Sequence, residues 1–410
     1  MIICWDFPPH AAIGGRRWAK MAKSLLKRGY NISVITSELT ESSKKLAWIS
    51  QKELDKISVH YLHHHKLTNW LNDYSSPFKF FKIHLARLLL FSFFKGTIFD
   101  RAIGVEKCFL ELARQLITEN AITTVFVTGA PFNLVYYAAR LKVIFPELKI
   151  VADYRDPWIN AQNYGMKNLS VSKMRDEHAK QDYVFEQVDY ITAPNSFLLQ
   201  EIKESYTGVK GIQAKFVELP HAFDPDDVVQ TIVPAKKDAK IKIIYGGTLY
   251  LGIDRYLELF NKAISQVRQN LKDRPLEVFF YTNESDKCLL FEENKDCVKF
   301  SKAVGDKIFD EVAGSDFILI LLSEHNKNYV TSKYYEFLPY KKPYLYVGPE
   351  GFVSEKIEKE GFGYCLKEPG DLAEILRKND VQKSSVEKEL THYTFDAVTG
   401  RLLNSIFNRE

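Results

Sequence analysis

Two adjacent glycines near the start of the chain, Gly14 and Gly15, follow a short apolar segment and precede a stretch with helical periodicity. Backbone amides at the start of a helix bind phosphates or sugar hydroxyls, and glycine leaves them uncovered. The spacing differs from GxGxxG, which disfavours a dinucleotide-binding site. A plain strand–helix turn, in which the glycines only allow a tight bend of the backbone, explains the same residues about equally well.

A second polar group, Asp153-Tyr154-Arg155-Asp156-Pro157-Trp158, comes directly after an apolar segment that we predict to be a strand. Folds of alternating strands and helices bind ligands at the carboxyl ends of their strands. Two carboxylates flanking an arginine can orient a hydroxyl group, bind a phosphate, or form an ion network that only holds the loop. Whether Asp153 or Asp156 takes part in proton transfer stays open.

The second half of the chain also pairs a glycine turn with polar residues at a helix start. Gly246-Gly247-Thr248-Leu249-Tyr250 follows an apolar segment, and Thr331-Ser332-Lys333-Tyr334-Tyr335-Glu336 opens a predicted helix with Ser332 as its N-cap. The helix amides and Lys333 suit phosphate oxygens. Arg255 is the nearest cation after the glycine turn, and a place on an exposed helix face is its alternative. For Glu336 the alternative is a surface helix glutamate.

The segment from Phe78 to Lys95 combines many Phe and Leu residues with four basic residues and no acidic one. Such a helix can lie in the plane of an anionic membrane. A core helix with outward-pointing lysines is the equal alternative. His63-His64-His65 lacks the spacing and the acidic partners of a metal site, so we expect a loop or strand end there and no metal.

Short apolar segments alternate with helical periodicity along the chain, which predicts right-handed βαβ units, parallel sheets and an α/β fold. We expect helices at 16–28, 106–119, 256–268, 305–313, 332–339 and 353–359. We expect strands at 2–5, 32–36, 124–127, 150–152, 190–193, 241–245, 276–281, 317–322 and 344–347.

A chain of 410 residues is too long for one ordinary core. Residues 224–240 are polar, bear prolines and have no clear period, so we expect a linker between a first domain (1–223) and a second (241–385). Apolar residues recur at helical intervals within 386–410, and we expect this helix to pack back on the first domain. Two doubly wound halves suit a ligand that bridges both across a cleft.

Composition narrows the class of protein. Hydrophobic residues make up 46% and charged residues 26%, which is typical of a globular protein. A net charge of +4 and the lack of a recognisable motif give no indication of nucleic-acid binding. Five scattered cysteines without a CxxC pair favour a reducing compartment. We find neither a signal peptide nor a membrane-spanning stretch, and therefore expect a cytoplasmic protein.

Three groups of motifs together resemble family-4 glycosyltransferases of the GT-B fold, of a bacterial surface-polysaccharide type. The opening PPHAAIGGRRWAKMAKSLLKRGYNISVIT resembles the PP…GG segment that precedes a helix ending in RG. FDRAIG, VTGAPFNL and VADYRDPW resemble the "PD…W", "TGPPFS" and "DxRDPW" signatures. YGGTLY and SKYYEFLPYKKP resemble the "YxGTLY" and "SKxxEYLxxxKP" signatures of the donor-binding domain. The match spans most of the chain in the expected order.

The resemblance implies two Rossmann-like domains facing across a cleft. It also implies retaining transfer of a hexose-type sugar from a UDP- or GDP-linked donor, with no cofactor and no essential metal. The acceptor would be a saccharide, polyprenyl-linked in many relatives, which favours contact between residues 78–95 and the inner face of the cytoplasmic membrane. The implied residues are catalytic Asp153, Arg155 and Asp156; donor-binding Gly14, Gly15, Gly247, Thr248, Tyr250, Arg255, Thr331, Ser332, Lys333 and Glu336; and acceptor-binding His10, Arg16 and Trp158.

Two positions depart from the family's pattern. Many relatives carry arginine and lysine after the glycine, where this chain has Thr248, and a second glutamate where it has Asn328. The cation that holds the diphosphate is therefore undecided between Arg255 and Lys333. A nucleotide-sugar epimerase of the same fold and a non-catalytic sugar-binding or assembly protein are the alternatives to a transferase.

Overall fold

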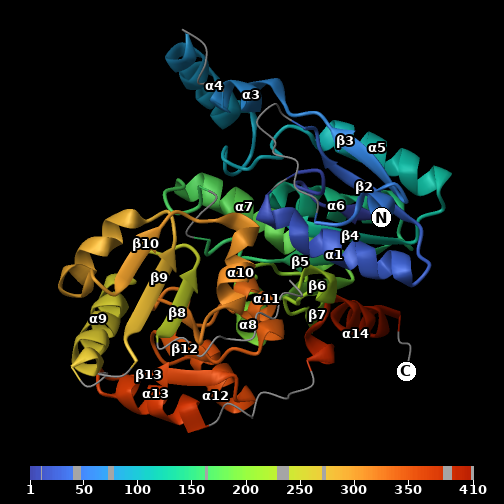
Figure 1. The fold of residues 1–410 in the computed structure, drawn as a ribbon. Coiled ribbons are helices and arrows are strands. Elements are labelled where there is room, and N and C mark those ends of the chain that lie inside the picture. The colour runs from blue at the N-terminus through green and yellow to red at the C-terminus, as the bar shows by residue number, and fades with distance from the viewer. Residues whose placement is uncertain are drawn as a thin grey trace. The chain divides into compact units, whose positions relative to one another are not determined.

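The computed structural model describes residues 1–10, 12–39, 48–72, 78–161, 165–228, 240–269, 274–381 and 390–407. The chain divides into two compact units, Met1–Pro220 with Val398–Glu410, and His221–Ala397. Each unit is built around one parallel sheet with helices between its strands (Figure 1). The predicted α/β class is therefore confirmed. Most of the predicted linker, residues 229–239, lies outside the described residues.

The first unit has a seven-stranded sheet in the order β3-β2-β1-β4-β5-β6-β7, in which every neighbouring pair is parallel. Its strands are β1 (Ile2–Ile3), β2 (Ile32–Ser37), β3 (Ile57–Leu62), β4 (Thr124–Gly129), β5 (Lys149–Tyr154), β6 (Tyr190–Ala193) and β7 (Lys215–Glu218). Its helices are α1 (Ile13–Lys27), α2 (Gln51–Leu54), α3 (Lys66–Asn72), α4 (Lys79–Phe93), α5 (Glu106–Glu119), α6 (Phe132–Ile144), α7 (Val171–Gln187) and α8 (Ser196–Glu204).

The second unit has a six-stranded parallel sheet in the order β10-β9-β8-β11-β12-β13. Its strands are β8 (Ile241–Gly246), β9 (Leu276–Tyr281), β10 (Val298–Ser301), β11 (Phe317–Leu321), β12 (Tyr344–Val347) and β13 (Gly363–Leu366). Its α-helices are α9 (Asp254–Arg268), α10 (Ile308–Ala313), α11 (Ser332–Phe337), α12 (Phe352–Glu360) and α13 (Asp371–Val381). Single 3-10 turns occupy Pro225–Asp227, Gly305–Lys307, Leu338–Tyr340 and Thr391–Tyr393, and a longer one Ser285–Asn294.

Both faces of the second sheet are buried, which explains why its strands are almost continuously apolar. Alternate residues along a strand point to opposite faces. Ile243 and Leu319 accordingly belong to one hydrophobic cluster, whereas Ile244 and Ile318 belong to another. The strands are thus held between two layers of side chains, and their carboxyl ends are fixed in register.

Most predicted elements are found, with small changes in their ends. The first strand is shorter than predicted, because a turn begins at Trp5. The predicted helix at the C-terminus begins later, as α14 (Phe395–Phe407), and residues 382–389 lie outside the described part. Most of α14 belongs to the first unit, in which the Lys149 and Tyr190 side chains donate to the carbonyl of Ile406 at 2.9 and 3.3 Å.

Candidate substrate-binding site

The order of the strands shows where each unit can bind a ligand. In the first sheet the chain proceeds outward in both directions from the β1–β4 pair, and in the second from the β8–β11 pair. At such a switch point the loops leave neighbouring strands in opposite directions and open a crevice at the carboxyl edge. The glycine turn at Gly14 follows β1, and the turn at Gly247 follows β8. Both predicted turns therefore lie at the switch points of their sheets.

Gly14 and Gly15 allow the start of α1 to approach its surroundings closely. A Cβ atom on Gly15 would lie 1.8 Å from the carbonyl oxygen of Asp6. A Cβ atom on Gly14 would lie 2.7 Å from Nη1 of Arg155 and 3.3 Å from a carboxylate oxygen of Asp6. The Gly15 amide donates to the Ala12 carbonyl at 3.0 Å, so its hydrogen bond is made within the turn. The turn thus places a guanidinium and a carboxylate beside Gly14.

Arg155 is held at this position by backbone carbonyls. Its Nε donates to the carbonyl of Gly129, the last residue of β4, at 2.9 Å, and its Nη2 donates to that of Ala130 at 3.1 Å. Arg155 and Asp156 are half-buried. The guanidinium therefore bridges the loop after β5 and the loop after β4 and presents its remaining edge to the Gly14 turn.

Asp153 has a different environment from the substrate contact that we predicted. Its side chain is fully buried, pairs with Arg17 Nε at 3.2 Å, and accepts from Trp18 Nε1 at 2.7 Å. Thr192 of β6 donates to it at 2.9 Å. A buried carboxylate needs such partners to remain charged. We therefore assign Asp153 to the positioning of α1 rather than to contact with a substrate.

The three predicted acceptor-binding side chains are also buried. His10 contacts the carbonyl of Ser37 through Nε2 at 2.9 Å, and the guanidinium of Arg16 lies over the Trp48 ring. The ring of Trp158 stacks on Phe132 and donates to Glu177 at 2.7 Å. Their exposed fractions are 7%, 6% and 1% for His10, Arg16 and Trp158. All three side chains therefore pack inside the first unit and do not lie at its surface.

Other groups at this edge were not predicted from the sequence. Asp6 accepts two hydrogen bonds from Arg101, at 2.9 and 2.7 Å, and lies against Gly14. The only signal in the sequence was the FDRAIG segment, which carries Arg101. Cys4 lies nearby, and burial raises the pKa of its thiol to about 12, although the Arg155 guanidinium acts in the opposite direction. Cys4 is therefore a neutral thiol at physiological pH and not a nucleophile.

In the second unit Lys333 lies next to the glycine turn. The Cε atom of Lys333 lies 3.7 Å from where a Cβ on Gly247 would be, and the Gly247 amide donates to the Tyr281 carbonyl at 3.1 Å. Thr248 is exposed, and its carbonyl accepts from the Tyr245 hydroxyl at 2.8 Å. Gly247 and Lys333, remote in sequence, therefore come together at the β8–β11 switch point.

The remaining predicted donor-binding residues surround this turn differently. Tyr250 and Arg255 are exposed, and the Arg255 guanidinium lies over the Tyr256 ring. Thr331, not Ser332, is the N-cap of α11, because Ser332 already has helical geometry. Glu336, near the end of α11, is 9% exposed and thus not a surface glutamate. Between the two candidate cations, only Lys333 is shown next to Gly247.

Asn328, at the position of the second glutamate in the family-4 pattern that the sequence resembles, holds a backbone group. Its side-chain oxygen accepts from the backbone amide of Phe352 at 3.1 Å, at the start of α12. This contact leaves Glu336 as the carboxylate of the predicted pair. Within the described ranges, no three His, Cys, Asp or Glu side chains are grouped as metal ligands.

Comparison with known proteins identifies the fold. No protein-family model matches the sequence, and no curated protein matches it. The lipopolysaccharide outer core galactosyltransferase WaaB, in its apo form, is 11% identical with a TM-score of 0.55, and covers 100% of this chain and 99% of its own. A Listeria monocytogenes protein described as a UDP-N-acetylglucosamine 2-epimerase is 10% identical with a TM-score of 0.54, at 100% and 97% coverage.

A third structure was solved with ligands. HepE of Anabaena, in complex with UDP and glucose, is 12% identical with a TM-score of 0.51, and the match covers 99% of this chain and 95% of HepE. Together with the two parallel sheets, these matches show that the chain has the GT-B fold. Identities this low establish the fold and leave the activity to be argued from the site.

The assignment of Asp153 predicts a loss of stability. Asp153→Asn leaves the buried Arg17 without its counter-charge, so we expect the free energy of unfolding to fall by about 3–5 kcal/mol. All five tryptophans (Trp5, Trp18, Trp48, Trp70 and Trp158) belong to the first unit, so tryptophan fluorescence during urea unfolding reports this unit. Asp156→Asn, in the half-buried loop after β5, is the control and should unfold as the wild type. Equal stability of both variants would contradict the assignment.

Proposed function

We propose that the chain is a glycosyltransferase that moves a sugar from a nucleoside diphosphate donor to a saccharide acceptor in polysaccharide or glycoconjugate biosynthesis. The observation that carries the proposal is the pairing of a glycine turn with a basic side chain at each switch point, Gly14 with Arg155 and Gly247 with Lys333. The likeness to WaaB, a galactosyltransferase, and to HepE, a protein with bound UDP and glucose, supports it.

The proposed reaction requires stabilisation of negative charge. The bond between the anomeric carbon and the β-phosphate oxygen breaks, and the nucleoside diphosphate leaves with the electron pair. The acceptor hydroxyl oxygen bonds to the anomeric carbon and releases its proton. Cations fixed beside the departing diphosphate lower this barrier. Lys333 is our candidate in the second unit, and the Glu336 carboxylate is our candidate acceptor of hydrogen bonds from the ribose hydroxyls.

The finer parts of the proposal follow from the resemblance to family-4 enzymes. The second unit holds the UDP- or GDP-linked donor, the first unit holds the acceptor, and a hexose-type sugar is transferred with retention of configuration. No cofactor and no essential metal takes part, because side-chain cations meet the charge of the diphosphate. Asp156 and Arg155 remain the candidates for direct contact with the reacting sugar.

We further propose that the acceptor is lipid-linked and that α4 contacts the inner face of the cytoplasmic membrane. Six large apolar side chains of this segment are more than half exposed: Phe78, Phe80, Phe81, Leu88, Phe91 and Phe93. Only Ile83, Ala86 and Leu90 of α4 are buried. Lys79, Lys82, Arg87 and Lys95 accompany them without an acidic residue. Exposed apolar groups with positive charge suit an anionic bilayer surface.

Contact of this kind is peripheral. Within the described ranges, no helix is long and apolar enough to cross a bilayer. The lysine Nζ of Lys173, from α7, donates to the carbonyl of Phe91 at 2.9 Å and also to that of Phe94. A cation at the end of a helix satisfies carbonyls that have no partner in the helix. The end of α4 is therefore fixed to the first unit while its aromatic residues face outward.

Turnover of the donor tests the transferase directly. Incubated with UDP- and GDP-sugars without an acceptor, the protein should slowly release nucleoside diphosphate and free sugar, as water replaces the acceptor. Lys333→Ala should slow this release by about 10²–10³-fold, the effect of removing one charge-stabilising group. Lys359→Ala, an exposed lysine of α12, is the control. Proton NMR of the sugar nucleotides separates the outcomes, because epimers have the same mass but different ring coupling constants. An isomerised sugar nucleotide without released diphosphate would instead identify the epimerase.

Sedimentation with vesicles tests the membrane contact. Wild-type protein should bind vesicles of phosphatidylglycerol and phosphatidylcholine, and rising salt should weaken binding because it screens surface charge. Replacing Phe80, Phe81 and Phe93 together by serine should lower the partition coefficient at least tenfold, equivalent to about 1.4 kcal/mol. A control variant in which the equally exposed Val143, Val209 and Leu289 become serine should bind normally. Unchanged binding by the phenylalanine variant would refute the contact.

A further inference from the structure

Arg101 and Asp6 form an ion pair at the edge of the first unit that contains the Gly14 turn. Two guanidinium nitrogens of Arg101 donate to the two carboxylate oxygens of Asp6, at 2.9 and 2.7 Å. The Asp6 side chain is 10% exposed, whereas the Arg101 side chain is 48% exposed. The carboxylate of the pair is therefore almost buried, and the planar guanidinium lies at the surface.

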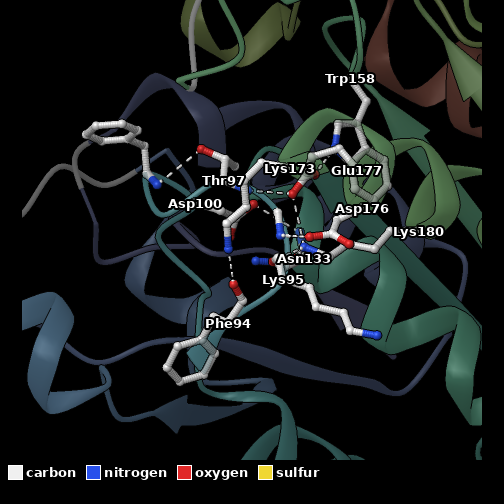
Figure 2. A network of polar contacts seen from close by, with 12 residues as sticks. Phe94, Lys95, Thr97, Asp100, Asn133, Trp158, Lys173, Asp176, Glu177 and Lys180 are labelled. Carbon is white, nitrogen blue, oxygen red and sulfur yellow. Dashed lines mark hydrogen bonds and ion pairs between the residues drawn. The ribbon is translucent and has the colours of Figure 1, made fainter. Parts of the chain in front are cut away.

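The segment that carries Arg101 is held by polar side chains of α6 and α7 (Figure 2). Glu177 accepts from the Thr97 amide at 2.8 Å, and Asp176 accepts from the Gly96 amide at 3.1 Å. Lys180 donates to the carbonyl of Lys95 at 3.0 Å and to the side chain of Asn133 at 2.8 Å. These contacts hold the backbone of residues 95–97, shortly before Arg101 in the chain.

Asp100 completes this support. It accepts from the amides of Ala102 and Asn133 at 2.9 and 3.0 Å. Burial raises the pKa of Asp100, whereas the Asn133 amide lowers it. Asp100 thus holds the loop next to Arg101, and the two hydrogen bonds to Asp6 hold the guanidinium itself. Such preorganisation is what a binding group needs and what a surface ion pair does not require.

Asp6 also connects Arg101 to the predicted site. One of its carboxylate oxygens lies 3.3 Å from where a Gly14 Cβ would be, beside Nη1 of Arg155 at 2.7 Å from the same point. Two guanidinium groups and one carboxylate therefore meet at the Gly14 turn. A hydroxyl group both donates and accepts hydrogen bonds, so it suits a carboxylate next to a guanidinium.

We propose that Asp6 and Arg101 form a hydroxyl-binding pair that positions a saccharide in the first unit. This inference rests on the proposed function, in which the first unit holds the acceptor. The guanidinium donates to a ring oxygen or hydroxyl oxygen of the sugar, and Asp6 sets the plane of that guanidinium. No sequence motif assigned a role to either residue, because the pair joins positions far apart in the chain.

Saturation-transfer NMR with methyl glycosides of glucose, galactose, mannose and N-acetylglucosamine tests this pair. Wild-type protein should bind at least one glycoside, and Arg101→Gln and Asp6→Asn should each raise its Kd about tenfold or more. Arg101→Lys keeps the charge but loses the planar fork, so it should also bind weakly. Arg140→Gln, which removes a half-exposed arginine paired with Glu106 in the same unit, is the control and should bind normally.

The outcomes separate this inference from the proposed function. Wild-type affinity in Arg101→Gln, or full rescue by Arg101→Lys, would overturn the hydroxyl-binding pair, as would a wild type that binds none of the glycosides. Release of nucleoside diphosphate from the donor, measured on the same variants, tests the transferase separately because the donor is assigned to the second unit. Glycoside binding that depends on Arg101 without any donor turnover would support the pair and refute the transferase.

Discussion

The buried carboxylate of Asp153 constrains the first unit more than any other group described. A charge with no exposed surface must be matched inside the protein, and here Arg17 and Trp18 of α1 provide most of that match. Arg17 also donates to the carbonyls of Leu219 and Pro220, after β7. These contacts hold the start of α1 at the carboxyl edge of the sheet. The close contact of Gly15 with Asp6, and the place of Arg155 beside Gly14, follow from that position.

A short segment connects the two surfaces that the proposals use. It leaves α4, where aromatic side chains are exposed, and leads along the chain to Arg101. Between them, Lys95, Thr97 and Asp100 lie among polar side chains of α7 (Figure 2). Lys173 fixes the end of the helix, and Glu177 and Lys180 fix the segment that follows. A lipid-linked acceptor carries its saccharide close to the bilayer. This segment therefore joins the helix of the proposed membrane contact to the proposed saccharide-binding pair.

Apolar runs and glycines predicted the parallel sheets and the positions of both turns, because strand alternation and the switch point depend on local composition and chain order. β3 was missed because it lies at the edge of its sheet and has few buried residues. The main property that the sequence did not predict was the direction in which side chains point. Asp153 and Trp158 have residue types common in sugar sites, yet both point into the core. Asp6 and Arg101 meet only after folding, so no spacing rule could pair them. Ser332 lies one residue inside its helix, a difference that the sequence does not decide.

The central claim is that the second unit binds a nucleoside diphosphate sugar through Lys333 and Glu336. Thermal unfolding with a panel of UDP-, GDP- and other nucleotide sugars measures this most directly. A ligand at a hundredfold excess over its Kd should stabilise the wild type by about 2.7 kcal/mol. Glu336→Gln should lose most of that stabilisation, and Glu355→Gln, an exposed glutamate of α12, should retain it. If no nucleotide sugar stabilises the wild type, or if Glu336→Gln responds as the wild type does, the claim is wrong.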